Sequence, residues 1–173
     1  MSIKGDTQRP KGASLSKQPL QGNSGGASDV RIFETPGDHL GHLSPEALAR
    51  VLATAADFAL VLDQDGQVLD FAKGVEPAPE GLEYWPGQSF TNLLTKDSLT
   101  KAEQLLAAAR AGAPATRWSQ LSHPKAEGED LPVAYLAEGL PHARVLLLAR
   151  SLAATAQLQQ QLLDAQYALE RDY

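Results

Sequence analysis

Residues 58–71 read FALVLDQDGQVLDF, and this stretch decides the fold. The segments FALVL at 58–62 and QVLDF at 67–71 flank a polar Asp-Gln-Asp-Gly segment. The pair Asp65-Gly66 tolerates the positive φ that a tight turn needs. The stretch therefore predicts two short antiparallel strands joined as a hairpin.

A helix is predicted directly before this hairpin. Ser44 supplies an N-cap hydroxyl, and Pro45 stands at the first helical position, where its missing N–H costs nothing. The helix is expected to run to about Asp57. Its apolar face is formed by four residues at helical spacing, namely Leu48, Val51, Leu52 and Ala55.

The segment after the hairpin changes character. Residues 74–98 are broken by Pro and Gly, but they contain enough large apolar side chains for short helical turns. A longer helix is predicted from Asp97 or Ser98 to about Ala111, with Gly112 as its stop.

Three further strands are predicted at 116–122, 131–137 and 144–152. The run VLLLA in the last strand is apolar at every position, which is typical of a central strand covered on both faces. This order of elements predicts an α+β fold, a five-stranded antiparallel sheet with its helices on one face. We expect one domain over residues 31–152.

Residues 1–30 are predicted to be a disordered tail. They contain Gly, Ser, Gln, Lys and Pro and no aromatic residue, so they cannot bury enough apolar surface to offset chain entropy. Just after the tail, Ile32 and Phe33 are expected to pack as a short strand or staple before a Pro-Gly turn at 36–37.

Charge and composition exclude several classes of function. The formal net charge of -6 opposes non-specific attraction to nucleic-acid phosphates, so we expect no DNA binding by these residues alone. The chain has no cysteine, which excludes disulfides, thiolate metal sites, a catalytic Cys and a cysteinyl-flavin adduct. No stretch approaches the roughly 18 apolar residues that span a bilayer, and the N-terminus lacks a hydrophobic signal core. A cytoplasmic location is therefore expected.

Residues 153–173 are predicted to form a glutamine-rich amphipathic helix, the start of a linker. No Gly, Asn or Pro ends it, so we expect it to continue in a longer protein. Its apolar residues follow each other at the seam spacing of a coiled coil, and they are Leu158, Leu162, Ala165 and Leu169. Two uses of this stripe remain open, pairing between protomers and packing onto the chain's own domain, because fewer than three heptads are present.

The element order, the Asp-Gln-Asp-Gly hairpin and the segment WPGQSFTNLLTKDS at residues 85–98 resemble a PAS domain over about residues 44–152. The stretch RSLAATAQLQQQLLDAQYALERDY at residues 150–173 is similar to the junction between the N-terminal PAS domain and the glutamine-rich linker of the PpsR/CrtJ family of photosystem-gene transcriptional repressors.

This resemblance implies an N-terminal PAS domain followed by a glutamine-rich helix, two further PAS domains and a C-terminal helix-turn-helix. DNA binding would then belong to the helix-turn-helix outside these residues. The resemblance also implies assembly into a dimer or tetramer and docking of an antirepressor protein. We expect the first-helix face, one face of the sheet and the C-terminal helix to form the oligomer interface.

The four histidines are candidate metal ligands. His39 and His42 are three residues apart and could share a metal, but metal sites usually need a third ligand and a fixed backbone. We therefore expect a solvated loop there and predict no metal. His123 and His142 are expected on the surface, beside a polar loop and in a turn. The acidic run in that loop is expected to be a solvated segment that keeps a strand edge soluble, and it comprises Glu127, Glu129 and Asp130.

A ligand cavity of the PAS kind would be lined by Trp85, Phe90, Leu106, Trp118 and Tyr135. Core packing is the more ordinary use of such residues. We predict no cofactor, since haem-binding PAS domains commonly use a His on the long helix and residues 98–112 contain none. No Ser/His/Asp pattern, phosphate-binding Gly loop or carboxylate pair is present, so no enzyme is expected.

Two hypotheses follow. The first is a non-catalytic assembly and sensory module of a photosynthesis-gene repressor. The alternative is a small-molecule sensor PAS domain of another signalling protein, such as a histidine kinase, in which a bound ligand changes the exit helix.

Overall fold

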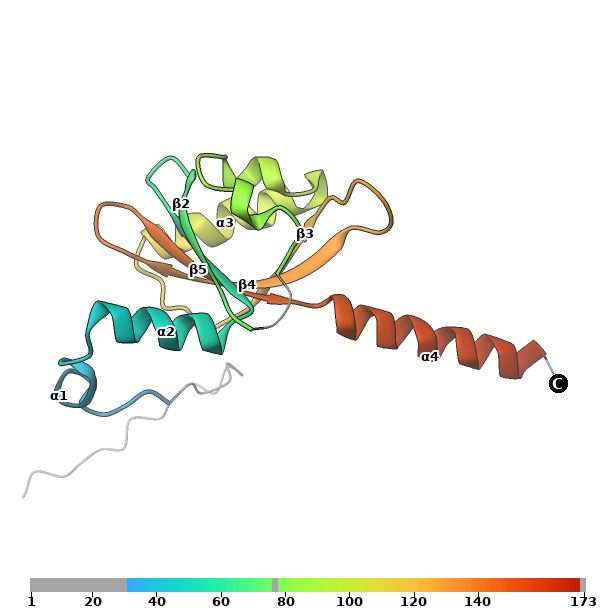
Figure 1. The fold of residues 1–173 in the computed structure, drawn as a ribbon, viewed down its shortest axis with the longest axis horizontal. Helices are drawn as coiled ribbons and strands as arrows, with labels where there is room; N and C mark the ends of the chain where they lie inside the picture. Colours follow the sequence, from blue (N-terminus) through green and yellow to red (C-terminus); the bar gives the residue numbers. More distant parts are fainter. Residues whose placement is uncertain (1–30, 76–77, 172–173) are drawn as a thin grey trace, which may run out of the picture. The chain divides into compact units, whose positions relative to one another are not determined.

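The computed structural model describes residues 31–75 and 78–171, and in it five strands form one antiparallel sheet (Figure 1). Their order across the sheet is β2-β1-β5-β4-β3. The strands are β1 Phe58–Leu62, β2 Val68–Lys73, β3 Ser119–His123, β4 Leu131–Gly139 and β5 Val145–Ser151. All five predicted strands are confirmed, with small differences at their ends. The predicted tail at 1–30 lies outside the described residues.

The β1–β2 turn forms as its residue types predict. The Asp63 carboxylate accepts hydrogen bonds from the backbone N–H groups of Asp65 and Gln67, each at 2.9 Å. Gly66 has a φ of 82°, which explains why glycine stands there. An irregularity between Val61 and Leu62 then shifts the register of the β1–β2 ladder.

The helices are α1 Pro36–Leu40, α2 Pro45–Ala55, α3 Leu99–Arg110 and α4 Ala153–Arg171, with three 3-10 turns, η1 Leu82–Tyr84, η2 Phe90–Leu93 and η3 Lys96–Ser98. The Ser44 hydroxyl accepts from Ala47 N at 3.1 Å, which confirms the predicted N-cap of α2. The prediction for Ile32 and Phe33 is wrong, because neither lies in a strand and both are exposed. The short helix α1 replaces the turn expected at 36–37.

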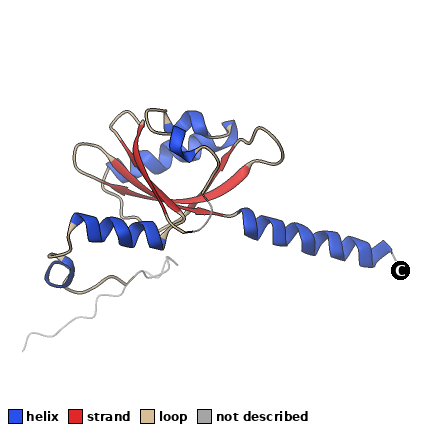
Figure 2. Ribbon diagram, in the orientation of Figure 1, coloured by secondary structure: helices blue, strands red, loops and turns tan. Residues whose placement is uncertain are grey.

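The core lies between one face of the sheet and α3 with the 3-10 turns. Strand β4 alternates buried and half-buried residues from Leu131 to Ala137, so one face of the sheet points into the core. Helix α3 contributes three side chains to that core, those of Ala102, Leu106 and Ala109. Figure 2 shows the strands in red beneath α3 and the short turns. No helix of the described residues is long and apolar enough to cross a membrane.

Helix α2 is arranged differently from α3. It contacts β1 and β2 but has no buried residue, and Figure 1 shows it on the side of the sheet away from α3. The predicted sheet with helices on one face therefore holds for α3 and the 3-10 turns, while α2 lies against the other side. Its own apolar residues remain largely open to solvent.

The second face of the sheet is apolar and only partly covered. Strand β5 is central, as VLLLA predicts, but only its alternate residues Val145, Leu147 and Ala149 are buried. Leu146 and Leu148, on the outer face, are half-buried. The expectation that both faces are covered is therefore met on the core side alone.

Candidate protein-interaction surfaces

The predicted face of α2 is exposed. Leu48 and Val51 keep 47% and 56% of their surface accessible, and Ala55 is also exposed. Leu52 is half-buried. The four residues predicted from helical spacing thus lie on a helix that presents apolar side chains to solvent. Such a face is typical of a contact with another protein surface.

The predicted stripe of α4 is exposed as well. Leu158, Leu162 and Leu169 are 59%, 60% and 65% exposed, and no residue of α4 is buried. Only Ala153, at the first turn, packs against the core. Packing of the stripe onto the domain of its own chain is therefore not observed in the described part of α4.

Two further apolar residues of α4 were missed in the sequence. Leu163 and Tyr167 are 45% and 62% exposed. They are four residues apart, so they share a helix face, and that face differs from the one that carries Leu158 and Leu162. Their i, i+4 spacing was the available signal, but the regular leucine stripe masked it.

The predicted ligand-cavity lining is mostly core. The rings of Phe58, Trp85, Phe90, His123 and Tyr135 pack together and are called here the aromatic cluster. Phe58 meets Trp85 and Tyr135 edge-on, with ring centroids 5.9 and 6.0 Å apart. Leu106 is also part of the core. Four of the five side chains of the aromatic cluster thus belong to the hydrophobic core, and they are Phe58, Trp85, Phe90 and Tyr135.

Trp118 is the exception, and its assignment to the cavity is wrong. On β3 the buried residues are Leu121 and His123, and side chains alternate between the two faces of a strand. Trp118, three residues before Leu121, therefore belongs to the outer side. It is 38% exposed, and the Arg150 guanidinium lies 4.5 Å from its ring centroid.

His123 corrects the prediction of a surface histidine, because it is only 4% exposed. Its Nδ1 lies 2.6 Å from the Leu93 carbonyl oxygen, and its Nε2 lies 2.6 Å from the Tyr135 hydroxyl. The carbonyl can only accept, so Nδ1 carries the proton and Nε2 accepts from Tyr135. Burial lowers the pKa of His123, although the Leu93 hydrogen bond acts in the opposite direction. Burial also raises the pKa of Tyr135, so burial favours the neutral form of both groups.

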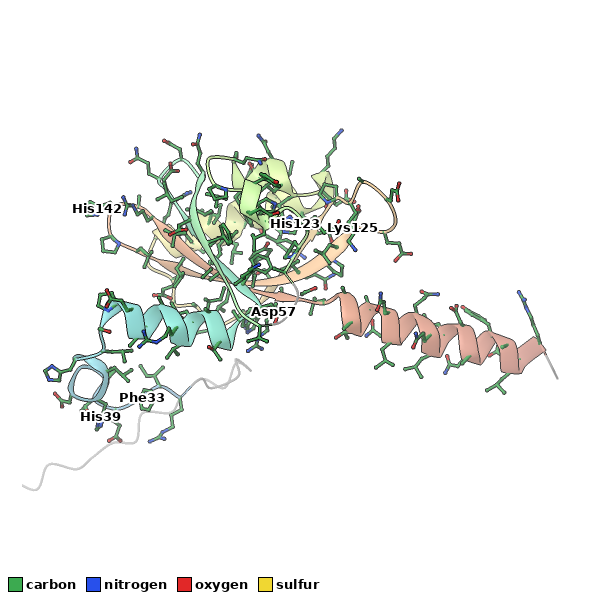
Figure 3. All side chains as sticks on the ribbon, viewed as in Figure 1. Phe33, His39, Asp57, His123, Lys125 and His142 are labelled. Atoms are coloured by element: carbon green, nitrogen blue, oxygen red, sulfur yellow. The ribbon has the colours of Figure 1, made fainter. Side chains whose placement is uncertain are left out.

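Beside this histidine lies an open cleft of about 930 Å³. Trp85 and His123 contribute to its wall, and Ser151 and Ala153 place it next to the start of α4. The charged side chains along it come from Glu80, Lys125 and Glu127. Figure 3 shows Lys125 and His123 on the same side of the domain.

The remaining candidate residues from the sequence are all exposed. His39 lies in the last turn of α1 rather than in a loop, and both it and His42 are exposed. The described residues hold no group of three or more His, Cys, Asp or Glu placed to bind a metal ion. His142 and the acidic run are exposed, as predicted for a turn and a solvated loop.

Comparison with known proteins gives the family. No family model matches the chain. Protein CrtJ of Rhodobacter capsulatus is 33% identical to it over 138 residues, which cover 78% of this chain. Over these residues the chain is CrtJ-like. This CrtJ-like chain spans only 29% of the length of CrtJ.

Several solved structures also match part of the chain at low sequence identity. A domain of a sensory box histidine kinase/response regulator from Geobacter sulfurreducens is 23% identical, with a TM-score of 0.43, and the match covers 61% of this chain and 92% of that one. A PAS domain from Desulfitobacterium hafniense is 19% identical, with a TM-score of 0.42 and coverages of 59% and 98%. The α+β fold of the CrtJ-like chain, with five antiparallel strands and a C-terminal helix, is the predicted PAS fold.

Proposed function

We propose that this CrtJ-like chain is a non-catalytic sensory and oligomerisation module of a transcriptional repressor of photosynthesis genes. The similarity to CrtJ supports the class of regulator. The observation that carries the assembly role is that the apolar stripes of α2 and α4 are both exposed. In this proposal DNA is bound by a helix-turn-helix outside these 173 residues, and the module acts in the cytoplasm.

The first contact is proposed between α2 and the outer face of the sheet. Leu48 and Val51 are exposed on α2, while Leu146 and Leu148 are half-buried on β5. Two copies related by a two-fold axis can each place α2 near the outer face of the other, so both apolar surfaces leave water together. Burial of apolar surface is the main driving force of such association.

The second contact is proposed along α4, between the Leu158, Leu162, Ala165 and Leu169 stripes of different copies. The glutamines at 159, 161 and 166 flank this stripe and carry no charge, so like copies do not repel there. A helix of this length is marginal alone in water, and pairing would stabilise it. Two contacts per chain are compatible with a dimer or a tetramer.

An antirepressor is proposed to dock on the same exposed residues of α2 and α4. A protein that covers these stripes competes with a second copy of the chain for them. Docking would therefore shift the assembly equilibrium, which is the physical basis for relieving repression.

A small-molecule sensor is the second candidate, and the cleft beside Trp85 and His123 is the observation in its favour. Its volume of about 930 Å³ lies in the range of ligand sites. It also borders Ser151 and Ala153, so an occupant would contact the start of α4. The predicted lining residues Phe90, Leu106 and Tyr135 would take no part, because they lie in the core.

Light scattering combined with an absorbance scan on the purified 173-residue chain tests these candidates. A colourless dimer or tetramer that loses mass in the variant V51E supports the assembly module. The matched control is A49E, because Ala49 is exposed and lies on another side of α2. A monomer that retains a chromophore or metabolite would contradict the assembly role and favour the sensor.

A further inference from the structure

The end of α2 and the start of α4 lie at the same end of two neighbouring strands, β1 and β5. Strand β1 begins three residues after α2 ends, and α4 begins two residues after β5 ends. Strands β1 and β5 are antiparallel neighbours, with Phe58 opposite Ala149. The chain therefore enters the sheet from α2 beside the point where it leaves the sheet for α4.

Asp57 occupies this junction. Its backbone N–H donates to the Ala149 carbonyl at 2.9 Å, and its own carbonyl accepts from Gly74 N at 2.9 Å. Its carboxylate Oδ2 accepts from Ser151 N at 2.8 Å. The β1–β5 ladder ends at the Phe58–Ala149 pair, so Ser151 has no β1 residue opposite it. The Asp57 side chain replaces that missing strand partner.

Ser151 in turn fixes the first turn of α4. Its hydroxyl accepts from Ala153 N at 3.4 Å, and Leu152 N donates to the Pro132 carbonyl at 2.9 Å. The Ser151 backbone is also paired with Val133 of β4, so Asp57 adds a hold from the β1 side. Asp57 is thus linked to the start of α4 through one hydrogen bond.

Asp57 is also tied to α2. Ala56 N donates to the Leu52 carbonyl at 3.1 Å, so the last turn of α2 ends immediately before Asp57. Gly74, whose N–H donates to the Asp57 carbonyl, packs against the same turn of α2. A Cβ at Gly74 would collide with the backbone carbonyl of Ala53. The last turn of α2 and the end of β2 are thus in close contact around Asp57. Figure 3 labels Asp57 at this junction.

We propose that Asp57 is a positioning residue that couples occupancy of the α2 surface to the order of the first turn of α4. This inference rests on the proposed function, in which a second copy of the chain covers α2. Covering α2 restrains its last turn and Asp57 with it, which strengthens the hold on Ser151 and α4. By linkage, ordering of α4 favours docking at α2 by the same factor.

Hydrogen–deuterium exchange on the 173-residue chain tests the coupling. The background is L158E/L162E, which removes pairing along α4 and leaves the α2 surface intact. Exchange is followed in residues 45–55 and 151–157, in dilute and in concentrated protein. The chains compared carry Asp57, D57A or D57N, since asparagine keeps an oxygen that can accept from Ser151 N. D65A is the matched control, because Asp65 lies in the exposed hairpin turn.

With Asp57, D57N or D65A, concentrating the protein is expected to slow exchange in both segments, by at least about fivefold in residues 151–157. With D57A, only residues 45–55 should respond. The coupling alone would be overturned if concentrating the protein protected residues 45–55 and left exchange in residues 151–157 unchanged. It would also be overturned if exchange in residues 151–157 slowed equally with Asp57 and with D57A. If residues 45–55 never respond to concentration, α2 docking fails and the coupling fails with it. Where D57A does not fold, D57S replaces it, because the serine side chain is too short to reach Ser151 N.

Discussion

His123 Nε2 accepts a hydrogen bond from the Tyr135 hydroxyl at 2.6 Å, inside the aromatic cluster. Trp85 stacks on the imidazole with ring centroids 4.9 Å apart. The other ring nitrogen, Nδ1, donates to the Leu93 carbonyl oxygen. Every hydrogen-bonding atom of this buried pair thus has a partner. The pair links β3, β4 and the η2 turn, so it stabilises the region between the sheet and the short turns.

Removing the Tyr135 hydroxyl should destabilise the fold. In Y135F the buried Nε2 of His123 loses its donor, and an unsatisfied buried polar atom costs about 1–3 kcal/mol. Urea unfolding followed by tryptophan fluorescence measures this change in the free energy of unfolding. Y84F is the control, because Tyr84 is 73% exposed and its change should stay within about 0.5 kcal/mol. Equal effects of the two substitutions would contradict the assigned role of the hydrogen bond.

The neutral state of His123 predicts a pH dependence of stability. Burial places the folded pKa below the unfolded value of 6.5, so between these two values the unfolded chain binds more protons. The free energy of unfolding should therefore be highest above about pH 6.5, fall as the pH drops through this window, and level off below the folded pKa. Protonation would also give Nε2 a hydrogen that opposes the Tyr135 hydroxyl hydrogen.

Unfolding curves between about pH 5 and about pH 8 check this sign. The fall in the free energy of unfolding at lower pH should disappear in H123Q and persist in H142Q, since His142 is exposed. The comparison is made as a difference from the unmodified chain, which removes the contribution of carboxylates that titrate at lower pH. An identical fall in H123Q would mean that other groups cause it.

The contact of α2 with the end of β2 predicts a sensitive glycine. In G74A the added methyl group meets the backbone carbonyls of Ala53 and Ala56, and forcing such an overlap costs about 1–3 kcal/mol. G37A is the control, because nothing lies within 4 Å of a Cβ at Gly37. Thermal unfolding should show a lower midpoint for G74A alone. Similar midpoints for the two variants would contradict the close packing of α2 on β2.

The hairpin and the order of elements were predictable from the sequence because they depend on local chemistry. The Asp65-Gly66 turn, the Ser44 cap and the stop at Gly112 each act over a few residues. The shared faces of the α2 and α4 stripes were predictable for the same reason, since helical spacing alone places their residues on one face. Their exposure was left open for α4 and comes from the structure.

The environment of His123 was not predictable in this way. Its sequence neighbours form a polar loop, but its hydrogen-bond partners, Leu93 and Tyr135, are 30 and 12 residues away. Pairing of β3 with β4 brings Tyr135 close to His123, and Leu93 comes from the η2 turn. Trp118 was wrongly assigned to the cavity. The alternation with Leu121 was visible in the sequence and places it on the other face.

Sedimentation equilibrium on the 173-residue chain tests whether the exposed apolar stripes hold copies of the chain together. We expect a self-associating chain whose dissociation constant rises by roughly tenfold or more in L158E/L162E, because two charges then face the seam. A156E/Q157E, which places the same charges on another side of α4 from Leu158 and Leu162, should associate like the unmodified chain. A chain that stays monomeric at all concentrations, or two variants that behave alike, would show that the stripes do not hold copies together.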